Sequence, residues 1–129
     1  MKGQCFCGSV SYELRGPCWH ATQCHCTICR RTSGAPCVAW VTVRRSNYRI
    51  VAGAPLSFRS SEHGTRSFCG ACGTPLSFCS DRLPDEIDVT IASLDDPEAV
   101  VPEDHTFVDS KLGWVELSDA LPRFPKARP

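Results

Sequence analysis

The chain has 129 residues, with 14 basic side chains, 14 acidic side chains and ten cysteines. This length fits one domain, and the cancelled charge argues against a protein that binds nucleic acid through a general basic field. The chain contains no apolar run long enough for a transmembrane helix, and its first residues lack the apolar stretch of a signal peptide. We therefore expect a cytoplasmic protein with neither a membrane nor a nucleic acid as partner.

Short alternating segments rich in β-branched residues predict a mainly β domain over residues 1–129. The strands expected in chain order are Val10–Leu14, Val38–Val43, Tyr48–Val51, Leu56–Ser60, Thr65–Phe68, Leu76–Cys79 and Ile87–Ile91. Between them we expect a helical turn at Arg30–Gly34 and a tight turn at Glu62–Gly64. After them, Leu94–Ala99 is typical of a short helix with an aspartate cap and an early proline, and Leu121–Pro125 is expected to be extended.

Seven of the ten cysteines fall into close sets, which are Cys5 with Cys7, Cys24 with Cys26 and Cys29, and Cys69 with Cys72. A disulfide between such near neighbours would be strained, because bridged α-carbons need a restricted distance and orientation. A zinc ion instead gathers close cysteines into one tetrahedron. In a reducing compartment, cysteines in this pattern are more consistent with metal ligands than with disulfides.

Counting ligands divides these cysteines between two sites. The two pairs supply the four ligands of a closed structural zinc site, Cys5, Cys7, Cys69 and Cys72. The central set supplies only three, Cys24, Cys26 and Cys29, which is the pattern of a catalytic zinc with a replaceable fourth ligand. The spacing leaves a second interpretation open, because a further side chain would make this site structural as well. The candidates for that fourth ligand are Cys37, Cys18, His20 and His25.

Glycines stand beside these cysteines at Gly8, Gly70 and Gly73. A metal knuckle turns sharply and directs backbone N–H groups at the thiolate sulfur, which favours glycine where φ is positive. We therefore expect metal knuckles at these positions instead of ordinary tight turns.

Three stretches and the tail carry a resemblance to a known family. They are Gly3-x-Cys5-x-Cys7-Gly8-x-Val10-x-Tyr12, Cys24-His25-Cys26-x-x-Cys29-Arg30-Arg31-x-Ser33-Gly34, Phe68-Cys69-x-x-Cys72-Gly73-x-Pro75-Leu76, and the tail residues Pro102, His105, Lys111, Trp114 and Leu121–Phe124. Together they resemble the glutathione-dependent formaldehyde-activating enzyme family, which also contains centromere protein V. The resemblance covers essentially the whole chain.

The resemblance implies a small β-tent fold of twisted antiparallel sheets held together by two zinc ions. It places a structural zinc on Cys5, Cys7, Cys69 and Cys72, and a catalytic zinc on Cys24, Cys26 and Cys29, in agreement with the ligand count. The implied activity is that of a carbon–sulfur lyase, which reversibly joins formaldehyde or a related small aldehyde to the thiol of glutathione.

Four residues near the second set are candidates for substrate binding. Arg30 and Arg31 would bind a carboxylate of a glutathione-like ligand, although a solvated pair beside an anionic site is an equal alternative. His25 would hydrogen-bond the substrate or act as acid or base, although a histidine between two ligands more often points away from the site. Ser33 would shape the adjoining loop. The competing hypothesis is a non-catalytic binding module that zinc holds together, with both metal sites closed. A third and less favoured hypothesis is redox sensing through the remaining cysteines.

Overall fold

The computed structural model describes all 129 residues and contains ten short strands and one short α-helix. The strands are β1 (Lys2–Gln4), β2 (Ser11–Leu14), β3 (Cys18–Cys24), β4 (Val38–Arg44), β5 (Tyr48–Ala52), β6 (Leu56–Arg59), β7 (Gly64–Phe68), β8 (Pro75–Ser80), β9 (Glu86–Thr90) and β10 (Asp104–Thr106). The helix α1 spans Thr27–Ser33, and 3₁₀ turns occur at Arg45–Asn47, Ile91–Ser93, Pro97–Ala99 and Val108–Ser110. No helix has both the length and the apolar character needed to cross a membrane.

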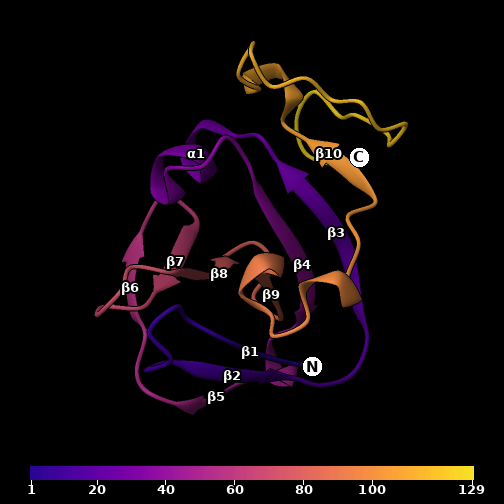
Figure 1. Ribbon diagram of the computed structural model, residues 1–129. Coiled ribbons are helices and arrows are strands. Elements are labelled where there is room, and N and C mark those ends of the chain that lie inside the picture. Colours follow the sequence, from indigo (N-terminus) through magenta and orange to yellow (C-terminus); the bar gives the residue numbers. More distant parts are fainter.

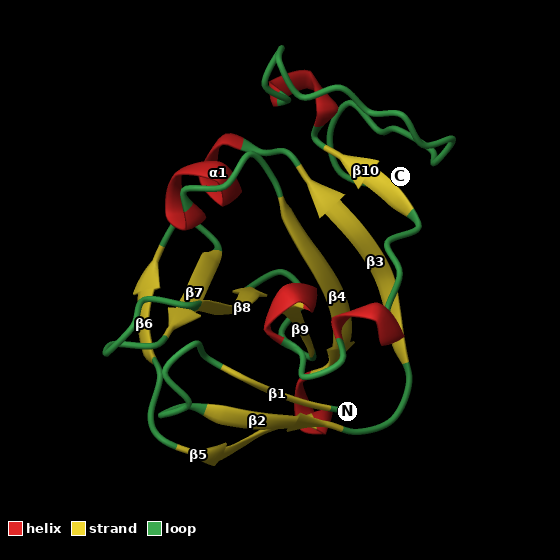
Figure 2. Ribbon diagram, viewed as in Figure 1, coloured by secondary structure: helices red, strands yellow, loops and turns green.

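The strands form two sheets, which confirms the expected mainly β architecture. A three-stranded sheet has the order β1-β2-β5, and a seven-stranded sheet has the order β10-β3-β4-β9-β8-β7-β6. All pairings are antiparallel except that between β10 and β3. Figure 1 shows the small sheet across one end of the molecule, while the large sheet rises on both sides towards α1. The segment after β10 extends past the edge of the large sheet as loops and turns (Figure 2).

The main core comprises 14 buried apolar residues drawn from both sheets. Val41, Val89 and Leu76, on the adjacent strands β4, β9 and β8, are completely buried. Tyr12 extends the core from the small sheet, where its hydroxyl group lies 2.6 Å from the Ser93 hydroxyl group. In β2 and β9 the alternation that predicts the strand reflects burial of one face against this core, whereas β4 buries four consecutive residues.

The predicted elements are present, with shifted ends and three omissions. The helix begins at Thr27, before the predicted Arg30, because Cys26 acts as its N-cap. The segment Leu94–Ala99 forms only a 3₁₀ turn, and the expected aspartate cap is wrong, because Asp96 makes no capping hydrogen bond there. Strands β1, β3 and β10 are absent from the prediction, since short or polar strands show no clear alternation.

Candidate functional site

The four-cysteine group (Cys5, Cys7, Cys69 and Cys72) connects the two sheets. Two members lie in the loop between β1 and β2, and the other two lie in the loop between β7 and β8. All four sulfur atoms lie within 4.8 Å of one another, and none of the chain's cysteines forms a disulfide. The separations of 3.6 Å for Cys5–Cys7 and 3.8 Å for Cys7–Cys69 match the edge of about 3.8 Å in a zinc tetrahedron with bonds of about 2.3 Å.

The backbone around this group turns as a metal knuckle requires. Gly8 and Gly73 have φ angles of 78° and 81°, a conformation that glycine adopts without steric cost. Their N–H groups close the turns on the carbonyl oxygens of Cys5 and Cys69, at 3.1 and 2.8 Å. Gly70 does not have a positive φ, but a Cβ there would meet the Leu56 side chain at 2.8 Å.

The three-cysteine group (Cys24, Cys26 and Cys29) lies where β3 passes into α1. Cys24 ends the strand, Cys26 caps the helix, and Cys29 lies in its first turn. The Sγ atom of Cys26 accepts a hydrogen bond from the Cys29 N–H group at 3.1 Å, so the cap that starts the helix also orients a candidate ligand. The three sulfurs lie within 4.8 Å of one another, and no other His, Cys, Asp or Glu joins the group.

The electrostatics of the three-cysteine group favour a bound cation. Hydrogen-bond contacts with Cys26 and Cys29, together with burial, raise the pKa of the Cys24 thiol. Hydrogen bonds from Cys24 and Cys29 lower the pKa of Cys26. By themselves, the three groups therefore favour a single thiolate. A divalent metal ion offsets the repulsion among three thiolates, so the donor set fits zinc in both cysteine groups.

Arg66 on β7 contacts the three-cysteine group directly. Its Nη2 donates to the Cys29 sulfur at 3.5 Å, and its Nε donates to the Ser60 hydroxyl group at 3.1 Å. The guanidinium carbon lies 5.6 Å from the Trp40 ring centroid and 5.0 Å from that of Phe78, and the residue is only 8% exposed. This buried cation partly balances the thiolate charge.

The three-cysteine group lines a cavity of about 510 Å³. The apolar part of its wall includes Trp40, Phe78 and Phe107, and the polar part includes Arg66 and Asp88. Residues 127–129, near the end of the chain, contribute to another side of this cavity. A concave apolar space with a few polar groups is typical of a small-molecule site, and we refer to it as the thiolate cavity.

The structure places the four predicted substrate residues away from this wall. His25 is 1% exposed, and its Nε2 lies 3.0 Å from Nδ1 of His105, which in turn lies 2.9 Å from the Asp119 carboxylate through Nε2. Arg30 and Arg31 do not line the thiolate cavity. Ser33 lies at the end of α1, where its hydroxyl group donates to the Cys29 carbonyl oxygen at 2.7 Å.

The alternatives for a fourth ligand are also separated from the three-cysteine group. His25 points to His105, and Cys18 is exposed at the far end of β3. His20 lines the thiolate cavity, but neither it nor Cys37 belongs to the group of sulfurs. Cys37 contacts the Gln23 side chain at 3.9 Å. The chain therefore offers this site three ligands.

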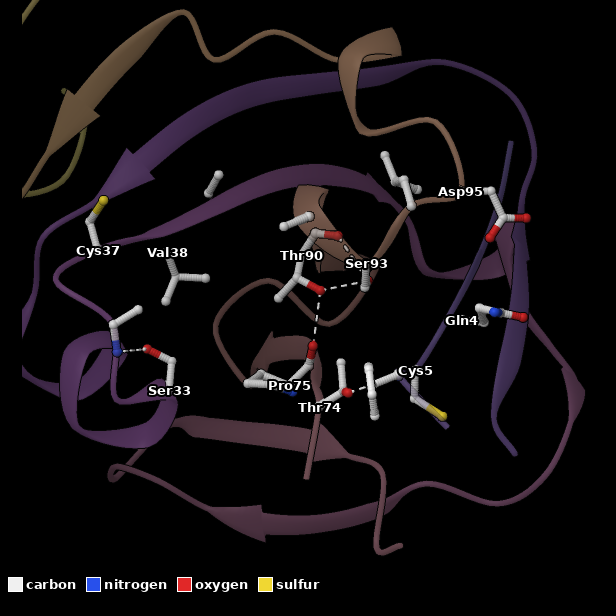
Figure 3. A pocket seen from close by; sticks show the side chains of 15 residues that line it. Gln4, Cys5, Ser33, Cys37, Val38, Thr74, Pro75, Thr90, Ser93 and Asp95 are labelled. Carbon is white, nitrogen blue, oxygen red and sulfur yellow. Dashed lines mark hydrogen bonds between the residues drawn. The ribbon is translucent and has the colours of Figure 1, made fainter. Parts of the chain in front are cut away.

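A larger cavity, of about 640 Å³, lies elsewhere and is shown in Figure 3. Ser33 and Cys37 lie towards one end of it, and Gln4 and Asp95 lie towards the other (Figure 3). Several polar groups in its wall bond to the protein itself. Thr90 donates to the Pro75 carbonyl oxygen at 3.0 Å, and the Ser33 hydroxyl group accepts from the Ala35 N–H group at 3.1 Å. This cavity lacks the three-cysteine group, so we assign the candidate site to the thiolate cavity.

Sequence reasoning missed Arg66 and Asp88, which bring charge to the thiolate cavity. Both lie within ordinary predicted strands, and neither adjoins a cysteine in the chain. Their only sequence signal is the presence of a charged residue inside a predicted strand. That signal is also typical of a solvent-facing strand position.

These features define a small β protein with two cysteine groups suited to metal ions. The family model described as glutathione-dependent formaldehyde-activating enzyme matches residues 1–110, and the chain belongs to this family. A Halomonas elongata protein named "Putative glutathione-dependent formaldehyde-activating enzyme" is 28% identical over 126 residues, covering 91% of this chain and 80% of the relative. A crystal structure of a Rhodobacter sphaeroides protein is 31% identical, with a TM-score of 0.64, and the match covers 82% of this chain and all of that one.

Proposed function

We propose that the protein reversibly joins the thiol of glutathione to formaldehyde, as a carbon–sulfur lyase of the cytoplasm. The observation that carries the proposal is the three-cysteine group, whose sulfurs lie within 4.8 Å of one another without a fourth ligand from the chain and face the thiolate cavity. Family membership supports the substrates, because the family's description includes both formaldehyde and glutathione.

We assign zinc to both cysteine groups, because three or four thiolates at these separations suit its tetrahedral coordination. The four-cysteine group would hold a structural ion, and Cys24, Cys26 and Cys29 would hold a catalytic one. Zinc bound there supplies positive charge that favours the thiolate form of a coordinating thiol. The catalytic assignment to these three cysteines rests on their position beside the thiolate cavity.

The proposed reaction balances without an oxidant or reductant. The substrate sulfur forms a bond with the carbonyl carbon of formaldehyde, and the π electron pair of the carbonyl group moves to its oxygen. The proton that the thiol gives up ends on this oxygen, so that the product is S-hydroxymethylglutathione. Trp40 and Phe78 give one side of the cavity an apolar wall, and Arg66 places positive charge beside the sulfurs, where it would stabilise the developing negative charge.

The proposal can be tested by exchange NMR with ¹³C-formaldehyde and glutathione, because the uncatalysed addition is itself reversible. The zinc-loaded protein should accelerate exchange between free formaldehyde and the adduct. The Cys26→Ser variant should lose this acceleration while it keeps one zinc ion per chain. Cys18→Ser is the matched control, since Cys18 is exposed and lies outside both groups. Exchange at the uncatalysed rate in the presence of wild-type protein with two zinc ions would refute the proposal.

A further inference from the structure

A ladder of paired residues crosses the part of the large sheet that lines the thiolate cavity. Thr42 on β4 pairs with Asp88 on β9, Asp88 pairs with Phe78 on β8, and Phe78 pairs with Arg66 on β7. All four residues line the cavity. Asp88 and Arg66 are two strands apart, a backbone separation of about 10 Å. The ladder therefore presents opposite charges at two places in the same cavity.

Asp88 has no ionic partner within the protein, whereas the charged contact of Arg66 is with the Cys29 sulfur. The Asp88 carboxylate accepts a hydrogen bond from the Thr42 hydroxyl group at 2.6 Å through Oδ1. It takes part in no salt bridge, and neither does Arg66. Asp88 is half-buried, and charges withdrawn from water are ordinarily paired. An unpaired carboxylate in a cavity wall therefore indicates a position where a cationic group of a ligand is accommodated.

The surroundings of Asp88 support this interpretation. Burial raises the pKa of its carboxyl group, while the hydrogen bond from Thr42 lowers it. Of the charged groups that act on it, Glu86 on the same strand and the Cys29 thiol on α1 raise the pKa, and His20 on β3 lowers it. His20 is exposed, and it forms no salt bridge with Asp88. A cation from a ligand would therefore supply the ionic partner that the fold does not.

We propose that Asp88 is a specificity-determining residue that binds the ammonium group of the thiol substrate, so that the thiolate cavity selects thiols with a free amino group. The inference rests on the proposed function, and it assigns the choice among thiol substrates to the Asp88 carboxylate. Arg66, on the opposite side of Phe78, would attract a carboxylate of the same molecule. A peptide of three residues reaches about 10 Å, which matches the two-strand separation of these charges.

Two probes that carry no thiol test this inference separately from the reaction. They are S-methylglutathione and its N-acetyl derivative, which differ only at the amino group, titrated calorimetrically into the zinc-loaded protein. The wild type should bind S-methylglutathione about tenfold or more tightly than the derivative, because a hydrogen bond to a charged group is lost. The Asp88→Asn variant, which retains an acceptor for Thr42, should bind the two probes within about twofold of each other.

Asp85→Asn is the matched control, since Asp85 is an exposed carboxylate just before β9 and lies outside the cavity wall. It should discriminate between the probes as the wild type does. Equal binding of both probes by the wild type, or binding of neither, overturns the inference, and this comparison does not depend on how the variants fold. Discrimination that persists in a folded Asp88→Asn variant overturns it as well.

The two proposals fail in different ways. Discrimination between the probes without acceleration of formaldehyde exchange would refute the proposed reaction and leave ammonium recognition by Asp88 intact. Acceleration of exchange by a protein that does not distinguish the probes would refute the role of Asp88 alone.

Discussion

Replacing one exposed cysteine of the four-cysteine group should measure what that group contributes to stability. Cys7 is exposed, so Cys7→Ser removes a proposed metal ligand with little loss of packing. Without metal, a surface substitution of this kind changes the free energy of unfolding by about 0.5 kcal/mol or less. The change seen with zinc bound therefore reports the metal cross-link itself.

The expected change in the free energy of unfolding follows from the length of the loop that a bound metal ion would close. Cys7 and Cys69 are 62 positions apart in the chain. A cross-link that closes a loop of about 60 residues lowers the conformational entropy of the unfolded chain. This loss stabilises the folded state by roughly 4 kcal/mol relative to the unfolded one. Cys7→Ser should therefore lower the free energy of unfolding by about 4 kcal/mol when zinc occupies the wild-type site and does not occupy the three-ligand remainder.

Urea unfolding monitored by circular dichroism provides the assay. A zinc buffer sets the free zinc concentration low enough to leave the three remaining cysteines of the variant empty, yet high enough to fill the four-cysteine site of the wild type. Cys18→Ser, at an exposed cysteine outside both groups, should behave as the wild type. In excess chelator, the wild type and Cys7→Ser should unfold at the same urea concentration. A loss below about 1 kcal/mol with zinc bound, or an equal loss in chelator, would refute the reasoning.

Two further predictions concern the fold. Gly53 has a φ of 77°, and a Cβ there would lie 2.1 Å from the Ser9 carbonyl oxygen, so Gly53→Ala should destabilise the protein by roughly 3 kcal/mol or more in urea unfolding. Gly34→Ala, with a similar φ but open space around the Cβ, should cost only about 1–2 kcal/mol, and equal losses would contradict the steric argument. Two hydrogen bonds lower the pKa of Asp119, the larger effect coming from His105 and the smaller from the Leu121 N–H group. The pKa of Asp119 in the folded protein is thus below its unfolded value of about 3.9. The stability that this carboxylate contributes is therefore present above that pH and is lost as the pH falls through the lowered pKa. Asp119→Asn should therefore be less stable than the wild type at neutral pH and equal to it in strong acid, and a difference in stability that does not change with pH would contradict this assignment.

Local patterns were sufficient for the cysteine groups and for most strands. Cysteines two or three positions apart are brought together by a single turn, so their spacing alone identifies them as candidates to share a metal ion. Strands such as β2 and β9 bury alternate residues along most of their length, and this burial appears in the sequence as alternation. Strand β3 was missed because its residues, Cys18–Cys24, show no regular alternation, although it pairs on both sides.

Closeness in the chain to the three-cysteine group did not predict which side chains line the thiolate cavity. His25 stands between two predicted ligands, yet its ring faces His105, which lies 80 positions further along the chain. Arg30 and Arg31 follow the last cysteine of the group, but the helix that Cys26 caps carries them away from the cavity wall. Alternate positions of a chain point to opposite sides of a strand, and a helix distributes its side chains around its axis.

The sequence by itself determined which cysteines could share a metal ion, how they divide into groups of four and three, and which family the chain resembles, because each of these properties depends on short spacings. Only the tertiary structure decided that Arg66 and Asp88 face the smaller group. Arg66 and Asp88 reach it through the pairing of β7, β8 and β9, and which strands become neighbours depends on how the whole chain buries its apolar surface.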